Sequence, residues 1–460
     1  MRSIKTPGLD ELLPLMGGGD HMAAKPKYPG IPTTADGATN VVHVETNITE
    51  GSAAYPITPS TTMGVGYGDA VSNGKKNIWG TPLVFLQPES EHSSASAAEG
   101  YQLAGGRGTN FTSGQGLILM KEVLYVISGK RLPIVFHIGS RAMTSHSLNV
   151  HAGHDDIMGV ADVGWGIIFA RNATEAGDLA LIARRAAENS DTPFFSVQDG
   201  FLTTHTIENV LQCEPELMKE YIADPADNLR NLIDPFNPIM TGIVQNQDSY
   251  MKGKIAQRHF TDTGKPALEE AMATFTELTG RPYSLVDGYQ MDDAEYAIIG
   301  IGSMIETTTT VVDQLRAKGE KVGCVHITCF RPFPGAEIVE MISGCKAVAI
   351  LERMDDPLSQ SNPLTMEIKS SIADAIQGAE GYPKIDSMPI MHSGSYGLGS
   401  RDVTSGDLAA VFEKLTNSNS PEYFSLGIEH ETALNPIDGL DGRPDGAFSM
   451  RGHSVGGFGS

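Results

Sequence analysis

The chain has 460 residues, of which 19% are charged and 40% hydrophobic, and its formal net charge is −23. This length exceeds one compact core and fits two or three domains of ordinary soluble composition. The acidic excess argues against nucleic acid and anionic membranes as partners, because both attract clustered Lys and Arg.

The sequence predicts a cytoplasmic chain without a membrane span. It holds no run of about 18 apolar residues, and its start lacks the apolar core of a signal peptide. Cys213, Cys324, Cys329 and Cys345 form no Cys-x-x-Cys pair. Because iron–sulfur clusters need about four closely spaced thiolates, we expect reduced core thiols and no cluster here.

Residues 1–32 mix a glycine run with several prolines, which predicts an amino-terminal arm. From residue 33 onward, predicted strands alternate with helices. The strands include Leu83–Leu86, of a buried type, Pro133–Ile138, Ile167–Phe169 and Phe194–Val197. This alternation predicts a mostly parallel sheet over residues 33–258, with ligands at the carboxyl ends of its strands.

Residues 259–292 are expected to link this domain to a second, smaller α/β unit over residues 293–418. In the second unit, Ser303-x-x-Glu306 predicts a capping box at a helix start. The preceding turn, Gly300-Ile-Gly302, could bind a dinucleotide phosphate, but a lone Gly-x-Gly without a third glycine is a weak signal. Residues 419–460 form a tail with a glycine-rich end.

The first stretch that suggests chemistry is Tyr55-Pro-Ile-Thr-Pro-Ser60. Its two prolines fix φ on both sides of Thr58 and favour extended backbone before each proline. We therefore predict that the Thr58 hydroxyl is held at the tip of a strand. The alternative interpretation is a stiffened strand end without a chemical role.

Further stretches follow this one in order. They are Ser90-Glu91, Phe111-Thr-Ser-Gly-Gln-Gly116, Phe136-His-Ile-Gly-Ser-Arg141, His154-Asp-Asp-Ile157, Asp199-Gly-Phe201 and Tyr396-Gly-Leu-Gly-Ser400. Together they resemble the pyruvate:ferredoxin (2-oxoacid:ferredoxin/flavodoxin) oxidoreductase family, specifically its pyrimidine-binding alpha subunit or amino-terminal domains I and II. The resemblance covers roughly residues 33–430.

This resemblance implies a fold. It implies a pyrimidine-type, thiamine-diphosphate-binding sheet domain of the α/β class, followed by a smaller domain similar to the transketolase carboxyl-terminal domain. The tail over residues 419–460 is similar to the start of the next, gamma-type domain of the family.

The resemblance also implies that Glu91 hydrogen-bonds the aminopyrimidine ring of thiamine diphosphate and promotes the tautomer that deprotonates the thiazolium carbon. From residues alone, the favoured interpretation of Glu91 is a solvated acid that the helix dipole stabilises in the first turn. Glu89 lies two positions earlier and offers a second acid.

For the substrate, the resemblance implies that Arg141 holds the carboxylate of a 2-oxoacid and that the Thr58 hydroxyl joins it. The arginine fork fits a carboxylate at two points, although a surface ion pair is the alternative for Arg141. Pro56 and Ile57 are implied to border the cofactor with Glu91 and Thr58. Relatives that use oxalate place a basic residue at the Thr58 position, so threonine favours a pyruvate-like substrate.

His146, His151 and His154, followed by Asp155 and Asp156, could be interpreted as metal ligands. The spacing from His146 to His151 does not place both on one helical face, and His-Asp-Asp is common in turns. We therefore favour a loop that borders the substrate and predict no metal site.

Thiamine enzymes bind Mg²⁺ through Gly-Asp-Gly followed about 25 to 30 residues later by Asn, and no such pattern is present. We therefore expect this chain to bind only the pyrimidine end of the cofactor, with Mg²⁺ and the diphosphate half on a beta-type partner chain. Gamma-type and ferredoxin-like partner chains would carry 4Fe–4S clusters. Coenzyme A is the expected co-substrate, ferredoxin or flavodoxin the acceptor, and the whole assembly is expected to dimerise.

The resulting hypothesis is a subunit of a pyruvate:ferredoxin oxidoreductase, which converts pyruvate and coenzyme A to acetyl-CoA and CO₂. One alternative is the same chemistry on 2-oxobutyrate, 2-oxoglutarate, or a branched-chain or aromatic 2-oxoacid. Another is a scaffold subunit without catalytic residues.

Overall fold

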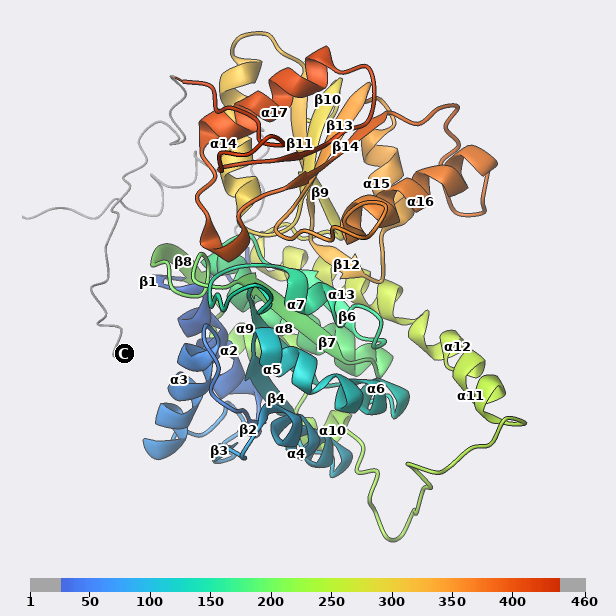
Figure 1. Cartoon of the computed structure of the whole chain (residues 1–460). Coiled ribbons are helices and arrows are strands. Elements are labelled where there is room, and N and C mark those ends of the chain that lie inside the picture. The colour runs from blue at the N-terminus through green and yellow to red at the C-terminus, as the bar shows by residue number, and fades with distance from the viewer. Residues whose placement is uncertain (1–25, 439–460) are drawn as a thin grey trace, which may run out of the picture.

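The computed structural model describes residues 26–438 and shows two α/β units, one above the other (Figure 1). The first unit is coloured mainly blue to yellow-green and the second mainly yellow to red. Most of the predicted amino-terminal arm, and residues 439–460 of the predicted tail, lie outside the described residues. Within residues 26–438, no helix is long and apolar enough to cross a membrane.

A seven-stranded sheet forms the centre of the first unit. Its strands run in the order β12 (Cys329–Arg331), β6 (Gly166–Phe169), β7 (Phe194–Asp199), β5 (Val135–Ser140), β4 (Gly108–Thr112), β2 (Gly51–Ala53) and β3 (Val84–Leu86). Every neighbouring pair is parallel except β12 with β6. The prediction of a mostly parallel sheet is thus confirmed.

Helices cover this sheet on both faces, and the sequences of its central strands are therefore largely apolar. Every residue of β5 and of β7 is buried. The helices are α2 (Gly37–Ile48), α3 (Thr61–Ser72), α4 (Glu91–Leu103), α5 (Gly114–Leu119), α6 (Lys121–Gly129), α7 (Asp155–Met158), α8 (Ala173–Ser190), α9 (Pro215–Tyr221), α10 (Pro225–Asn228) and α13 (Gly264–Thr279). Helix α8 packs on β5, β6 and β7, whereas α4 packs on β2 and β4.

Strand β3 does not have the buried character that the sequence suggested. It pairs only with β2 and forms an edge of the sheet, where Val84 and Leu86 are 54% and 52% exposed. The prediction was wrong because hydrophobicity alone does not distinguish a central strand from an edge strand.

A two-stranded antiparallel ribbon of β1 (Ile31–Ala35) and β8 (Glu208–Gln212) lies at the side of the first unit. After α10 the chain leaves the body in a long irregular stretch before α11 (Tyr250–Ala256) and α12 (Arg258–Thr261), at the right of Figure 1. Helix α11 buries none of its residues.

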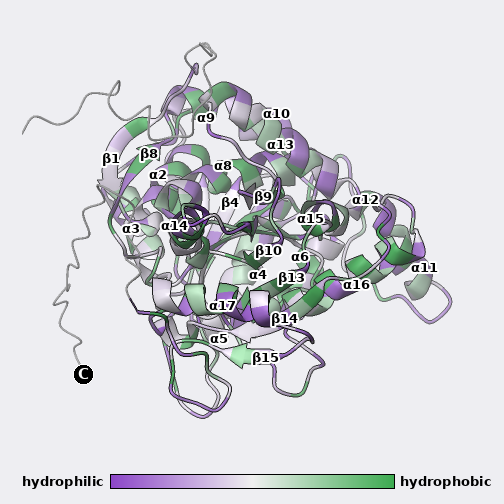
Figure 2. Cartoon of the chain, turned by 90° about the horizontal axis from the view of Figure 1, so that it is seen from above, coloured by the Kyte–Doolittle hydropathy of each residue, from purple (hydrophilic) through white to green (hydrophobic). Residues whose placement is uncertain are grey.

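The second unit is built on a six-stranded sheet in the order β15 (Tyr423–Ser425), β14 (Ile390–Ser395), β13 (Ala347–Glu352), β10 (Tyr296–Gly300), β11 (Val322–Ile327) and β9 (Val286–Tyr289). Only the β11–β9 pair is antiparallel. Its helices are α14 (Met304–Arg316), α15 (Gly335–Ile342), α16 (Pro363–Gln377) and α17 (Ser405–Asn417). Figure 2 shows hydrophobic colour on central strands such as β10 and β13 and mixed colours on outer helices such as α17.

Residues 259–292, expected to be a linker, instead belong to both units. Helix α13 packs along α8 of the first unit, and β9 joins the second sheet. In return, β12 of the later sequence joins the first sheet. The expected linker is therefore divided between the two units, and one strand of the later sequence joins the edge of the first sheet, which a linear division of the sequence cannot anticipate.

Candidate functional site

The candidate site lies where four parallel strands of the first unit end. Thr58 and Arg141 lie in the loops after β2 and β5, and Glu91 and Gln115 lie in the first turns of α4 and α5, which follow β3 and β4. Strand β2 has β3 on one side and β4 on the other, so the chain reverses its winding direction there. Open α/β sheets bind ligands at the carboxyl ends of their strands near such a reversal.

Arg141 connects two of these segments. Its Nη1 donates to the Thr58 main-chain carbonyl at 2.6 Å, and its Nη2 donates to Gln115 Oε1 at 2.5 Å. The side chain lies across Gly114, where an added Cβ would come within 2.5 Å of Arg141 Nε. Gly114 has φ +52, so glycine suits both the backbone and the close approach of the arginine.

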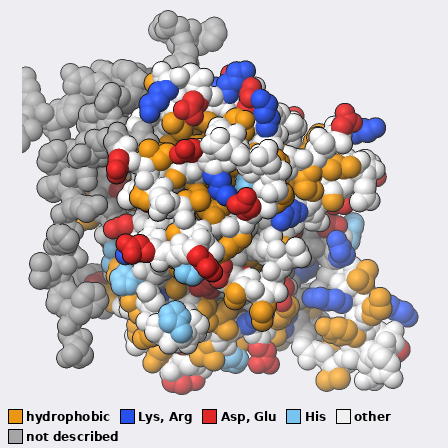
Figure 3. Space-filling model, turned by 45° about the horizontal axis from the view of Figure 1, so that its top comes forward, with side chains coloured by type: hydrophobic (Ala, Val, Ile, Leu, Met, Phe, Trp, Pro, Cys, Tyr) orange, Lys and Arg blue, Asp and Glu red, His pale blue; other side chains and the backbone are white. Residues whose placement is uncertain are grey.

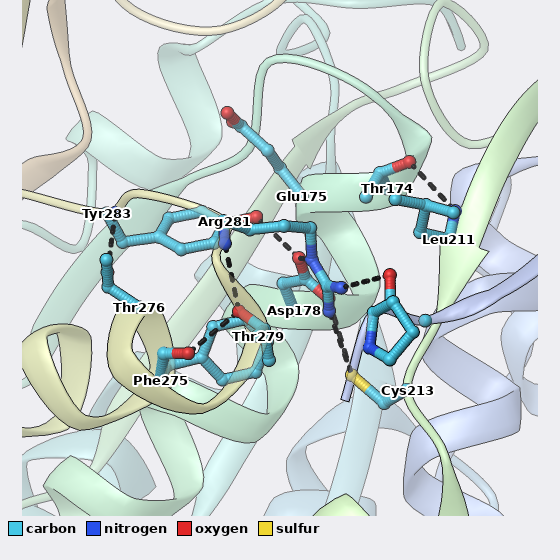
Figure 4. A network of polar contacts seen from close by, with 12 residues as sticks. Thr174, Glu175, Asp178, Leu211, Cys213, Phe275, Thr276, Thr279, Arg281 and Tyr283 are labelled. Carbon is cyan, nitrogen blue, oxygen red and sulfur yellow. Dashed lines mark hydrogen bonds and ion pairs between the residues drawn. The ribbon is translucent and has the colours of Figure 1, made fainter. Parts of the chain in front are cut away.

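Arg141 differs from the other buried arginines in its partners. Among the described residues 26–438, five arginines are buried, and four of them pair with carboxylates: Arg107 with Glu188, Arg184 with Glu45, Arg281 with Asp178 and Arg353 with Asp199. Figure 4 shows one such pair, in which Arg281 binds Asp178 through two nitrogens. Arg141 is 5% exposed, and within residues 26–438 it forms no ion pair and its Nε has no hydrogen-bond acceptor.

Burial lowers the pKa of Arg141, although the Asp156 and Glu91 carboxylates oppose this effect. Burying a guanidinium without a partner is costly, so such a group is expected to meet an anion in the working protein. A planar fork with a free Nε suits a carboxylate.

Glu91 is the first residue of α4, whose start is capped by the Ser90 hydroxyl, an acceptor from Ser93 N at 3.2 Å. Its side chain is 9% exposed and packs on Gly116, where a Cβ would lie 2.6 Å from Glu91 Cγ. Among the residues that the structure describes, none donates a hydrogen bond to the Glu91 carboxylate. By contrast, Glu89 is exposed and accepts from the Ser93 hydroxyl.

The Tyr55–Ser60 segment places the main-chain carbonyl of Thr58 next to Arg141. The side chain of Thr58 is exposed. Ser60 closes the segment by donating to the Ile57 carbonyl at 2.8 Å. Pro56 lines a cavity of about 390 Å³ beside α3. Neither Glu91 nor Arg141 is among the residues that line this cavity, so the cavity adjoins the site without containing it.

Two further residues of the site, Gln115 and Asp156, were not among the predicted site residues, although Asp156 was considered as a metal ligand or as part of a loop that borders the substrate. Gln115 accepts from Arg141, and Asp156 accepts from the backbone nitrogens of Gly114 and Arg141 at 2.7 and 3.0 Å. Both lie in stretches that carry the resemblance, Phe111–Gly116 and His154–Ile157. That ordered set was the only signal that could have marked them.

The three histidines of the following loop are not brought together. His154 is buried and its Nε2 contacts Asp199 Oδ1 at 2.7 Å. His151 stacks on Phe201 with 4.5 Å between ring centroids, and His146 is exposed. Within residues 26–438, no group of three or more His, Cys, Asp or Glu side chains is arranged to hold a metal ion.

The predicted capping box at α14 does not form. The Ser303 side chain does not accept a hydrogen bond from the first turn of α14, and its hydroxyl donates to Asp199 of the first unit instead. Gly302 faces the same carboxylate, since a Cβ there would lie 2.8 Å from Asp199 Oδ2. The Gly300–Gly302 turn, considered for phosphate binding, is therefore occupied by an acidic side chain of the first unit.

All four cysteines are free and buried. Burial raises the pKa of the Cys324 and Cys345 thiols to about 12. Cys213 donates to Asp178 inside the network of Figure 4. These thiols therefore act as core side chains in the described structure.

The fold and the site define an α/β protein with a ligand site at the strand ends of its first sheet, followed by a second α/β unit. Residues 44–273 match the family described as "Pyruvate flavodoxin/ferredoxin oxidoreductase, thiamine diP-bdg", and residues 294–388 match "Pyruvate:ferredoxin oxidoreductase core domain II". The chain belongs to the pyruvate:ferredoxin/flavodoxin oxidoreductase family.

Relatives agree with this assignment. A pyruvate-flavodoxin oxidoreductase of Klebsiella pneumoniae is 35% identical over 407 residues, which are 88% of this chain and 34% of the relative. A pyruvate:ferredoxin oxidoreductase of Moorella thermoacetica is 31% identical over 93% of this chain and 36% of the relative. The chain thus spans about a third of these relatives. A pyruvate-flavodoxin oxidoreductase sequence of Nostoc sp. is 32% identical over 88% of this chain and 98% of the relative.

Among solved structures, the chain is similar to a 2-oxoglutarate:ferredoxin oxidoreductase from Magnetococcus marinus, solved with 2-oxoglutarate, coenzyme A and succinyl-CoA bound. The TM-score is 0.61, and the similarity covers 84% of this chain and 66% of that chain. Sequence identity is 18%, so this likeness supports the fold alone.

Proposed function

We propose that this chain is the pyrimidine-binding part of a pyruvate:ferredoxin or pyruvate:flavodoxin oxidoreductase. The overall reaction would convert pyruvate and coenzyme A to acetyl-CoA and CO₂ and pass two electrons to ferredoxin or flavodoxin. The observation that carries this proposal is Arg141, a buried guanidinium without a carboxylate partner at the rim of a thiamine-diphosphate-binding domain.

In this proposal Arg141 binds the substrate carboxylate through its free nitrogen positions. Gln115 and the Thr58 carbonyl fix the guanidinium plane from two sides. The exposed Thr58 side chain offers a hydroxyl next to the bound 2-oxoacid. Because two of the guanidinium contacts are made by uncharged groups, the positive charge stays available to the substrate.

Glu91 would hold the aminopyrimidine ring, with Pro56 and Ile57 bordering the cofactor. A carboxylate that is mostly buried and receives no hydrogen bond from the described residues fits a donor supplied by a ligand. When bound, thiamine diphosphate supplies the carbanion equivalent that side chains cannot provide. The role of Glu91 is to keep a proton acceptor at the ring nitrogen and thereby favour the reactive tautomer.

The Klebsiella pneumoniae and Moorella thermoacetica relatives are about three times as long as the region matched here, and their remaining regions indicate what other parts the complete enzyme needs. We propose that these parts include a beta-type part with Mg²⁺ and the diphosphate half of the cofactor. Gamma-type and ferredoxin-like parts would carry 4Fe–4S clusters, and the whole assembly would be a dimer. A scaffold subunit without catalytic residues is the less favoured role, because that role does not explain why Arg141 is buried without a carboxylate partner among the described residues.

The test is a substrate panel on the assembly purified with its partner parts. Pyruvate-dependent and coenzyme A-dependent reduction of ferredoxin or flavodoxin is expected, with pyruvate preferred over 2-oxobutyrate, 2-oxoglutarate, and branched-chain or aromatic 2-oxoacids. Preference for another 2-oxoacid would correct the substrate. Absence of activity with every 2-oxoacid, in an assembly that contains thiamine diphosphate and clusters, would overturn the proposal.

A further inference from the structure

Asp156 is a buried carboxylate that joins three segments of the site. It lies in α7, is 0% exposed and accepts four hydrogen bonds. Its Oδ2 accepts from the backbone nitrogens of Gly114 at 2.7 Å and Arg141 at 3.0 Å. Its Oδ1 accepts from the Ser140 hydroxyl and from Ile157 N, both at 2.7 Å.

The two bonds to Oδ2 determine where Arg141 lies. One fixes the backbone that carries the arginine, and the other fixes Gly114, across which the arginine side chain extends. A single oxygen therefore ties the start of α5, which follows β4, to the end of β5. It adds two bonds to backbone nitrogens to the link that the Arg141–Gln115 bond makes between the same segments.

The same carboxylate reaches Glu91 through α5. Gly114 is the first residue of this helix, and Gly116, two positions later, packs against the Glu91 side chain. A displacement of the Gly114 nitrogen would move Gly116 with it, because both lie in one helical turn. Asp156 thus supports both proposed ligand-contacting side chains from one point.

The segment just before α7, the helix that carries Asp156, contacts the second unit. His154 precedes α7, contacts Asp199 through its ring and donates its backbone nitrogen to the Arg353 carbonyl at 2.9 Å. The position of α7, and therefore of Asp156, depends on the contact between the two units.

Burial raises the pKa of Asp156 to about 6, although its four donors oppose the rise. The Asp156 carboxylate in turn raises the pKa of Arg141 against the effect of burial. Burial of this carboxylate costs desolvation free energy, and its four hydrogen bonds offset this cost while they fix the positions of the donors. Because Asp156 is fully buried, it does not contact the substrate itself.

We propose that Asp156 is a positioning residue that sets the relative placement of Arg141 and Glu91. The proposal rests on the function proposed above for these two residues. It predicts a specific failure when Asp156 is lost, namely weaker binding of the 2-oxoacid, because Arg141 would no longer be held on Gly114.

Two variants separate this role from a general loss of stability. Asp156→Ala removes all four hydrogen bonds. Asp156→Asn keeps one acceptor oxygen, which is expected to face Gly114 and Arg141, because the Ser140 hydroxyl can turn to accept from the new amide and only the Ile157 nitrogen then loses its acceptor. The effect of Asn should therefore be smaller than that of Ala at the same position.

The matched control is Glu352→Gln in the second unit. Glu352 is also buried and accepts backbone bonds from Leu364 at 2.8 Å and Thr365 at 3.0 Å, but it touches none of the proposed ligand-contacting residues. Its loss should affect folding stability and leave KM for pyruvate unchanged.

The first readout requires no activity. Hydrogen–deuterium exchange of the full chain, followed by mass spectrometry, should be faster in Asp156→Ala in peptides covering residues 111–120 and 138–145. Exchange should be unchanged in the second sheet. Unchanged exchange in both peptides would overturn the positioning role, whatever the assembly catalyses.

The second readout uses the complete assembly. KM for pyruvate is expected to rise roughly tenfold to a hundredfold in Asp156→Ala, less in Asp156→Asn and not in Glu352→Gln, while KM for coenzyme A stays constant. Faster exchange with an unchanged KM for pyruvate would also overturn the proposal. If the wild-type assembly uses no 2-oxoacid, the proposed function fails, and the exchange experiment still decides the structural role of Asp156. If Asp156→Ala does not fold, Asp156→Asn is compared with Glu352→Gln in both readouts.

Discussion

The Asp199 carboxylate of the first unit accepts two hydrogen bonds from Ser303 of the second unit, from its backbone nitrogen at 2.9 Å and from its hydroxyl at 2.6 Å. Ser303 follows β10, and Arg353, which pairs with the same carboxylate at 3.4 Å, follows β13. Strand β10 has β11 and β13 as neighbours, so this is where the winding of the second sheet reverses. Such a crevice commonly binds a ligand, and here a side chain of the first unit fills it.

This contact leads to a prediction about stability. Asp199→Ala would leave Arg353 buried without its carboxylate, and removal of one partner of a buried pair costs about 3–5 kcal/mol. Denaturant unfolding should show this loss. Asp293→Ala, which breaks the exposed pair with Arg316, is the control and should leave unfolding almost unchanged. Equal effects of the two substitutions would contradict a structural role for the buried pair.

The same contact should persist in mild acid. Burial alone would raise the pKa of Asp199, but Arg353 and His154 outweigh burial and hold it well below its usual range. The stabilisation by Asp199 is therefore present above the ordinary aspartate pKa and is lost only as pH falls through the lower folded value.

Arg141→Leu should raise KM for the 2-oxoacid while cofactor binding stays the same. Hydrogen bonds to charged groups contribute roughly 1.5–3 kcal/mol, which corresponds to about tenfold to a hundredfold. Arg141→Lys should give an intermediate value, since lysine keeps the charge but lacks the fork. Arg230→Leu, at a side chain that is 63% exposed, is the control. Unchanged steady-state kinetics in Arg141→Leu would remove this residue from the substrate site.

Glu91→Gln should slow proton exchange at the thiazolium carbon, because the amide cannot replace the carboxylate as proton acceptor. Proton transfer by a positioned side chain contributes about 10²- to 10⁴-fold, so the loss should be large. Exchange can be followed by NMR in deuterated buffer on the complete assembly.

Glu89→Gln is the matched control, since Glu89 is exposed and bonded to Ser93. If Glu89→Gln slows exchange and Glu91→Gln does not, the assignment is wrong by two residues. If neither variant slows it, this segment has no such role.

Glu352 should make folding less favourable as pH rises. Burial raises its pKa to about 7, so the folded chain holds a proton that the unfolded chain releases. The stabilisation is complete below the unfolded pKa and is lost as pH rises through about 7. Between pH 5 and 8, the free energy of unfolding of the wild type should fall by about 2–3 kcal/mol relative to Glu352→Gln. Parallel pH profiles of the two proteins would show that Glu352 does not titrate in this way.

The sequence predicted the parallel sheet and the order of the chemical stretches. Apolar runs such as Phe194–Val197, separated by helices, define buried parallel strands because both faces of such strands are covered. The site stretches follow these strands directly, so their position at carboxyl ends could be inferred. By contrast, the exposed edge position of β3 and the pairing of β12 with β6 depend on partners distant in sequence.

The local interpretation of Ser303 was wrong for a related reason. Ser303-x-x-Glu306 satisfies the pattern of a capping box, and nothing within four residues contradicts it. The Ser303 hydroxyl donates to Asp199 instead, and Glu306 accepts from Asn172 of the first unit at 2.9 Å. Competition between a local and a distant acceptor is decided by the packing of the two units.

The sequence by itself determined which residue types stand at the strand ends, because local periodicity and proline constraints act over a few positions. It also carried the ordered stretches by which the family is recognised. Only the tertiary structure decided that, in the described part of the chain, Arg141 is buried without a carboxylate while the other buried arginines are paired, and that Asp156 links the segments around it. Burial and hydrogen bonding join residues that lie far apart along the chain, so these properties exist only once the two units have packed together.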